Sequence, residues 1–173
     1  DKWNSGTLTM DTSFYYYNKG YIFVNTLIYF LFGPNTYNMR LLNIFLSSLV
    51  IVNMMYFIGK ISDCKTAIKA GVFYTVFPSL ILISVYQFKD IFVLFFLSTF
   101  LLFLLSFYKH PRFGSFISIL IQIGGIFLFR QVYALIMLGI FFITVMQMDK
   151  KKVKSGYKVL LVTAIVFSLI IVV

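Results

Sequence analysis

Long stretches without a charged residue constrain this chain more than any other feature. The charged residues divide the sequence into uncharged, apolar segments at 41–59, 70–88, 91–108, 113–129, 131–148 and 159–173. The first five are 17 to 19 residues long, and a helix that crosses the hydrocarbon core of a bilayer needs about 20 residues. Only 12% of the residues are charged and the mean hydropathy is +0.95, whereas a soluble domain carries about 25% charged residues. These observations indicate an integral membrane protein.

The distribution of basic residues predicts the orientation of the chain. The loops 59–69, 108–114 and 149–158 hold ten of the fifteen Lys and Arg residues, and even numbers of crossings separate them. Loops rich in Lys and Arg face the cytoplasm, so we place these three loops inside. A net charge of +10 would indicate nucleic-acid binding in a soluble protein, but here the loops account for it. Nucleic acid is therefore not an expected partner.

We predict an all-α fold, a polytopic membrane bundle of about six transmembrane helices. The expected spans lie at approximately 37–58, 66–88, 90–108, 113–129, 131–148 and 157–173. The stretch from 113 to 148 is too long for one span at a rise of about 1.5 Å per residue. Arg130 should therefore mark the outer turn of a hairpin. We expect Pro78 to kink the helix over 66–88, because neighbouring groups can satisfy the backbone atoms that a proline frees.

The segment 20–32 is too short for an ordinary span. As a helix it would extend about 20 Å, well below a hydrocarbon core of about 30 Å. We interpret it as a juxtamembrane helix on the outer face, within an extracytoplasmic loop at 1–36. In the alternative it is a tilted span and the N-terminus lies inside. The chain starts with Asp1 and stops within an apolar segment, so we expect a piece of a longer protein.

Few charges are predicted on the outer side, which makes those at helix ends informative. Arg40, Lys89 and Arg130 stand there; such side chains either snorkel to lipid headgroups or bind a phosphate of an anionic substrate. Asp90 begins a crossing, where an ionisable residue is costly and points to function. It could also pair with Lys89 or complement the helix dipole. Arg130 and Arg40, on other helices, are equally plausible partners.

Other polar residues carry less information. Four residues within the predicted spans are expected to form interhelical hydrogen bonds: Asn43, Ser47, Ser48 and Asn53. A single cysteine and a single histidine exclude a disulfide framework and a His/Cys metal cluster. The chain has neither a phosphate-binding glycine loop nor a Ser/His/Asp set, and the sequence names no metal ligands.

Several short motifs occur in a characteristic order. They are YYNKGY at 16–21, LFGPN at 31–35, MRLLN at 39–43, YFIGK at 56–60, FPSL at 77–80, KD at 89–90 and an R-x-x-Y at 130–133. In this order they resemble the membrane glycosyltransferases of the GT-C fold. The resemblance covers about residues 16 to 135 and is nearest to the relatives of the protein O-mannosyltransferases and aminoarabinose transferases.

The resemblance implies an enzyme that uses a polyprenyl-phosphate-linked sugar as its donor. The sugar would pass to a lipid, glycan or protein acceptor outside a bacterial cytoplasmic membrane, in the synthesis of cell-envelope polysaccharide. The resemblance implies that the general base is an Asp in the first outer loop, after a first transmembrane helix that we expect to be missing from this piece. Asp1 is the better candidate for the base and Asp11 the second. A second outer acid of the family corresponds to Asp90, which is also a catalytic candidate, because it could deprotonate the acceptor hydroxyl.

An inverting transfer also needs cations for the departing lipid phosphate. The candidates for binding it are Arg40, Lys89, Arg130 and, from the R-x-x-Y motif, Tyr133. A divalent metal could replace one of these cations, and the sequence leaves the cofactor open.

Alternative functions remain at this stage. The nearest is a repeat-unit polymerase; the others are a transport subunit and a non-catalytic scaffold of envelope-polysaccharide assembly. A transporter would place polar or charged groups around a site at mid-membrane, whereas the predicted crossings are almost free of charge at their centres.

Overall fold

The computed structural model describes residues 19–78, 81–82 and 89–148, and this part of the chain is helical. The helices are α2 (Lys19–Phe32), α3 (Thr36–Ile61), α4 (Cys64–Val76), α6 (Asp90–Lys109), α7 (Phe113–Phe129) and α8 (Gln131–Gln147). By length and composition α3 and α6 can cross a membrane, and α2, α7 and α8 are apolar but shorter. The described residues therefore form the helical architecture that the apolar segments predict.

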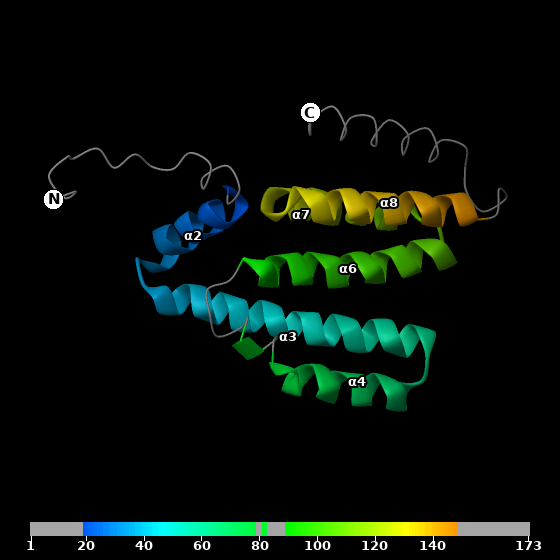
Figure 1. Cartoon of the computed structure of the whole chain (residues 1–173), viewed down its shortest axis with the longest axis horizontal. Coiled ribbons are helices and arrows are strands. Elements are labelled where there is room, and N and C mark those ends of the chain that lie inside the picture. Colours follow the sequence, from blue (N-terminus) through cyan, green and yellow to red (C-terminus); the bar gives the residue numbers. More distant parts are fainter. Residues whose placement is uncertain (1–18, 79–80, 83–88, 149–173) are drawn as a thin grey trace, which may run out of the picture.

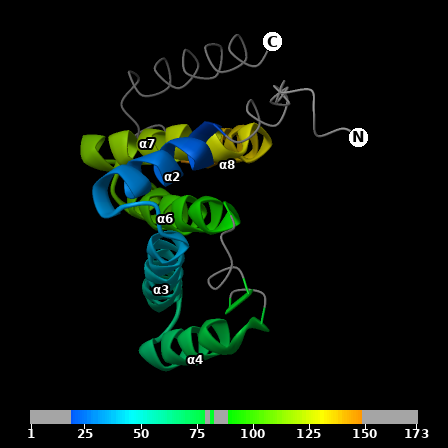
Figure 2. The ribbon, with the colours of Figure 1, turned by 90° about the vertical axis from the view of Figure 1, so that its left-hand side faces the viewer.

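The helices form a stack in which α3 lies between α4 and α6. α4 packs on α3, α3 on α6, and α6 on the antiparallel pair of α7 and α8, as Figures 1 and 2 show from two directions. α2 crosses one end of this stack and contacts α3 and α7. We call this end, which holds the starts of α3 and α6 and the turn between α7 and α8, the Asp90 end. The opposite end, where α3 and α6 stop and α4 and α7 start, is the Lys109 end.

Most of the helices occupy the segments that the charges delimit. α3, α6, α7 and α8 lie over the spans expected at 37–58, 90–108, 113–129 and 131–148, and α2 forms the short helix expected at 20–32. Arg130 is the residue between α7 and α8, so the predicted hairpin is confirmed. The expected span at 157–173 lies outside the described residues.

The segment predicted at 66–88 differs from expectation, because α4 ends at Val76. Phe77 is extended, with φ −66° and ψ 116°, since the ring of a following proline disfavours the α conformation. Beyond it, the Ile81 N–H donates to the Phe77 carbonyl at 3.2 Å, so one helical hydrogen bond spans Pro78. Helical structure is therefore interrupted at Phe77 and present again at Pro78, Ile81 and Leu82, so the kink expected within one continuous helix is instead a break that ends α4.

Side-chain caps set the beginnings of α3 and α4. Asn35 accepts a hydrogen bond from the Tyr37 N–H at 3.0 Å, and Gly33 just before it has φ +85°, a conformation that favours glycine. Asp63 accepts from the Thr66 N–H at 3.4 Å and also from the Thr66 hydroxyl. Each cap satisfies a backbone donor at a helix start, so the turns α2–α3 and α3–α4 are short and defined.

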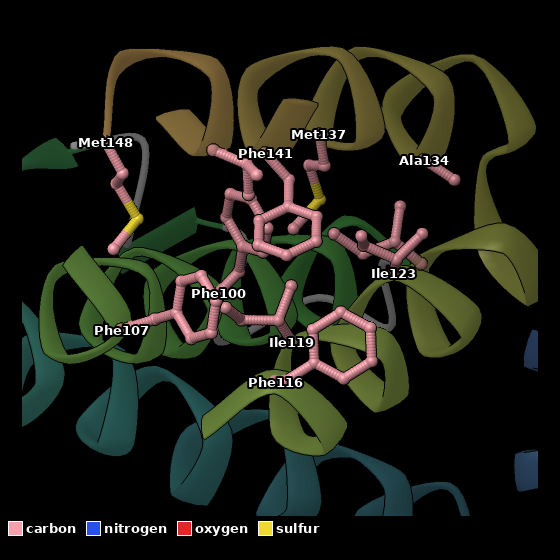
Figure 3. Close-up of a cluster of buried hydrophobic side chains, with 11 residues drawn as sticks. Phe100, Phe107, Phe116, Ile119, Ile123, Ala134, Met137, Phe141 and Met148 are labelled. Carbon is pink, nitrogen blue, oxygen red and sulfur yellow. The ribbon is translucent and has the colours of Figure 1, made fainter. Parts of the chain in front are cut away.

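Two apolar clusters hold the stack together. One fills the space between α6, α7 and α8, where the Phe107 ring lies 5.7 Å from the Phe141 ring, centroid to centroid (Figure 3). The other lies at the Asp90 end, where α2, α3, α6 and α7 meet. There the rings of Phe92 and Phe129 stack with centroids 5.0 Å apart. This second cluster includes Ile91 and Phe129, the sequence neighbours of Asp90 and Arg130.

Side-chain hydrogen bonds join α3 to α6 within the described residues. The Asn53 side-chain amide on α3 donates to the hydroxyls of Ser98 at 3.2 Å and Thr99 at 3.0 Å on α6, which confirms the expected interhelical role of Asn53. Ser47 and Ser48 instead donate to the Ile44 carbonyl of their own helix. A serine hydroxyl in a helix can donate to the carbonyl one turn earlier. In the described part of the chain, these two serines therefore form hydrogen bonds within α3 and not to another helix.

Candidate functional site

The first turn of α6 presents Asp90 at the edge of the bundle. The three residues that follow it, Ile91, Phe92 and Val93, are buried at 0%, 6% and 7% exposure and anchor the helix start in the apolar cluster. Asp90 is the acidic residue of this first turn, where the unpaired N–H groups of a helix favour a negative charge. Its side chain is 47% exposed, so it is held firmly and is still open to a ligand.

Arg130 forms the corner between two helices. Its N–H donates to the Ile126 carbonyl at 2.7 Å, and its own carbonyl accepts from the Ala134 N–H at 3.3 Å. Its backbone is extended, so one residue ends α7 and precedes α8. Phe129 and Ala134 on either side are buried at 5% and 3% exposure. The guanidinium therefore projects from a fixed corner.

The structure joins these two residues. Arg130 Nη2 lies 3.3 Å from Asp90 Oδ1, so Asp90 pairs with a cation from another helix, one of the alternatives that the sequence left open. Both side chains are about half exposed, 45% for Arg130 and 47% for Asp90, and such a pair stabilises a fold by only about 0–1 kcal/mol. The hydrogen bond uses one of the five guanidinium N–H donors, which leaves donors for a further anion.

The beginning of α2 lies beside this ion pair. A Cβ built on Gly20 would stand 2.6 Å from the Leu128 carbonyl oxygen, two residues before Arg130. The Tyr21 ring meets the Phe92 ring edge-on with centroids 6.3 Å apart, two residues after Asp90. Lys19, the first residue of α2, is thereby brought to the same corner. Sequence reasoning missed this role of Gly20, for which the only signal is a glycine at the start of an apolar helix.

Three further candidates belong to the same end of the bundle. Arg40 is exposed on α3, and its guanidinium carbon lies 5.7 Å from the centroid of the Tyr37 ring. Lys89 directly precedes Asp90, and Tyr133 is 48% exposed in the first turn of α8. Of the three cations weighed as partners of Asp90, the structure shows Arg130 in an ion pair with it.

Two further expectations concern the catalytic general base and a bound metal ion. Asp1 and Asp11, the candidates for the base, lie outside the described residues. Within the described ranges no group of three or more His, Cys, Asp and Glu residues could hold a metal ion.

The described residues form a bundle of apolar helices, two of them long enough to cross a membrane, with an ion pair at one end, which is consistent with a helical membrane protein. A family model described as dolichyl-phosphate-mannose-protein mannosyltransferase matches residues 20–173. The chain belongs to this family of GT-C-type membrane glycosyltransferases, which confirms the resemblance seen in the motifs. Neither the curated proteins nor the solved structures give a match.

Proposed function

We propose that the chain transfers a sugar from a polyprenyl-phosphate donor to an acceptor hydroxyl at the extracytoplasmic face, and that Arg130 binds the donor phosphate. The family description names a sugar linked to a lipid phosphate, which is the anion that a guanidinium binds well. The observation that carries the proposal is the Asp90–Arg130 pair, a half-exposed cation held in place at the end of the bundle.

The proposed topology places the Asp90 end outside and the Lys109 end in the cytoplasm of a bacterial cell. It uses the six crossings expected from the sequence, with the crossing at 66–88 interrupted at Phe77, and keeps α2 as a juxtamembrane helix. α2 has 14 residues, which is about 21 Å of helix. Its outward side chains Phe23, Leu27 and Phe30 are 68%, 46% and 85% exposed, as suits a helix that lies against lipid.

Arg130 would assist the departure of the lipid phosphate. As the bond between the sugar carbon and the phosphate oxygen breaks, negative charge grows on that phosphate, and a preorganised cation stabilises it. A planar guanidinium suits this role, because it can donate two parallel hydrogen bonds to one phosphate. Lys19, Lys89 and Arg40 at the same end would add positive potential, and Tyr133 a hydroxyl.

Asp90 would position Arg130. Transfer also requires a carboxylate that takes the proton of the acceptor hydroxyl, and the Asp90 carboxylate is already engaged by Arg130. We therefore assign the base to Asp1 or Asp11, with Asp90 as the alternative. A divalent metal bound with the donor would share the phosphate charge.

Binding of polyprenyl phosphate without a sugar tests the site whichever sugar the enzyme uses. The full chain in liposomes would be compared with Arg130→Gln and with a matched control, Arg112→Gln, which removes an exposed arginine from the opposite end. We expect Arg130→Gln to weaken polyprenyl-phosphate binding and to lower transfer from a polyprenyl-phosphate sugar about 100-fold or more. The control should stay within about twofold of wild type. Unchanged binding and transfer in Arg130→Gln would overturn the proposal.

A further inference from the structure

The Lys109 end carries a concentration of exposed cations. Its basic residues within the described ranges are Lys60, Lys65, Lys69, Lys109 and Arg112, all of them exposed. Asp63 is the acidic residue among the described residues of this end. Cations thus outnumber acids at this end as they do at the Asp90 end, but here the described residues show no ion pair.

Two of these lysines are brought to one place by two different helices. The Lys109 ammonium, in the last turn of α6, donates to the Lys60 carbonyl in the last turn of α3 at 3.0 Å. The Lys60 ammonium lies over the Tyr56 ring, 4.7 Å from its centroid. Both positions are favourable because the C-terminal end of a helix attracts positive charge. The arrangement therefore holds the Lys109 side chain against the end of α3 that carries Lys60, with both lysines exposed at the surface.

The nearby acid does not neutralise them, because its carboxylate is committed to a helix cap. Asp63 accepts hydrogen bonds from the N–H and the hydroxyl of Thr66 and from the hydroxyl of Ser62. Within the described residues, neither Lys60 nor Lys109 forms an ion pair. Their charge is thus available to an external anion.

The surface next to the two lysines is apolar and aromatic. Tyr56, Ile61 and Tyr108 are 57%, 61% and 49% exposed beside them. Tyrosines beside basic residues at helix ends are typical of the boundary between headgroups and acyl chains. An anion that fits here carries its charge on a headgroup and has hydrocarbon chains attached.

We propose that Lys60 and Lys109 form a binding site for the phosphate of an anionic phospholipid, whose acyl chains lie along the apolar surface beside Tyr56 and Tyr108. The site is separate from the one that we assign to the donor phosphate, and it does not depend on that assignment.

The test measures how phosphatidylglycerol binds to the full chain in nanodiscs of phosphatidylcholine, by native mass spectrometry and by the rise in unfolding temperature. The Lys60→Gln/Lys109→Gln variant would be compared with Lys65→Gln/Lys69→Gln, which removes the same charge from the same end without the contact between α3 and α6. The basic segment 149–158 stays intact in every variant. Inorganic phosphate and polyprenyl phosphate are run as separate arms.

We expect Lys60→Gln/Lys109→Gln to lower phosphatidylglycerol affinity about 100-fold, because each hydrogen bond from a lysine to a charged phosphate contributes about tenfold. The Lys65/Lys69 control should lose much less, inorganic phosphate should not compete, and Arg130→Gln should leave phosphatidylglycerol binding unchanged. Equal losses in the two double variants would show diffuse attraction by net charge and overturn the site. So would equal binding of phosphatidylglycerol and phosphatidylcholine by wild type, a result that needs no variant to fold.

Discussion

The two ends of the bundle use charge in different ways. At the Asp90 end, an acid on α6 and a cation between α7 and α8 lie 3.3 Å apart, with the start of α2 packed beside them. At the Lys109 end, a lysine contacts a backbone carbonyl, and the acid caps α4. The comparison teaches that composition alone does not decide which charges meet, since both ends contain acids and bases.

The difference also separates two kinds of phosphate binding. A guanidinium held by a carboxylate has a fixed direction, which suits a phosphate that must be oriented for reaction. Two lysines at helix C-termini offer positive charge without a planar fork, which suits a headgroup that only has to be retained. The following four predictions test this comparison in order of decreasing effect.

The largest effect is expected from exchanging the partners of the ion pair. Asp90→Arg alone places two cations together, and Asp90→Arg/Arg130→Asp restores their attraction but moves the cation from the fixed corner to α6. We expect the exchange to recover the unfolding temperature lost in the single variant, while transfer stays about 100-fold or more below wild type. Transfer kinetics and thermal unfolding measure this. Recovery of transfer by the exchange would show that the pair acts only in stability.

The second prediction concerns the cover provided by α2. Gly20→Ala should destabilise the protein by about 1–3 kcal/mol, because the new Cβ meets the Leu128 backbone carbonyl, which cannot move aside cheaply. Gly139→Ala in α8 is the control; its Cβ meets nothing within 4 Å, so it should be neutral or stabilising by up to about 1 kcal/mol. Equilibrium unfolding in detergent measures both. Equal stability of the two variants would contradict the close approach of α2 and α7.

The third prediction concerns the connection between the two ends through α3 and α6. Asn53→Ala removes the hydrogen bonds to Ser98 and Thr99 and should cost about 0.6–1.7 kcal/mol, the usual range for such bonds in membrane bundles. Ser118→Ala, whose hydroxyl bonds only the Gly114 carbonyl of its own helix, should cost less. A double-mutant cycle of Asn53→Ala with Thr99→Val would show no coupling if the bond were absent.

The smallest effect is expected at the Lys109 end, from the cap of α4. The Thr66 hydroxyl, which donates to Asp63, lowers the pKa of that carboxyl below its ordinary value. Since the folded pKa is the lower one, the cap contributes fully above the unfolded pKa, about 3.9, and is lost as pH falls through the folded value. Thr66→Val should raise the Asp63 pKa in an NMR titration. An unchanged pKa in that variant would remove the hydroxyl as its cause.

Much of the fold could be predicted because charge is costly in hydrocarbon. Lys109 ends α6, Arg130 separates α7 from α8 and Lys19 begins α2, so the uncharged segments indicated the helices closely. The end of α4 was missed, since the sequence indicates a proline but not whether its helix bends there or stops. The sequence indicated Asp90 as a candidate functional residue, but it did not decide which of three cations, Lys89, Arg40 or Arg130, forms an ion pair with it.

The sequence by itself determined where the apolar helices lie and how the charges divide between the two ends, because the free energy of placing a side chain in lipid depends mainly on that side chain. Only the tertiary structure decided that Arg130 rather than Arg40 meets Asp90, and that Lys109 reaches Lys60. Those contacts depend on how closely helices distant in sequence approach each other. The packing of the helices sets these distances. At the Asp90 end, α2 can lie against α7 because Gly20 has no side chain.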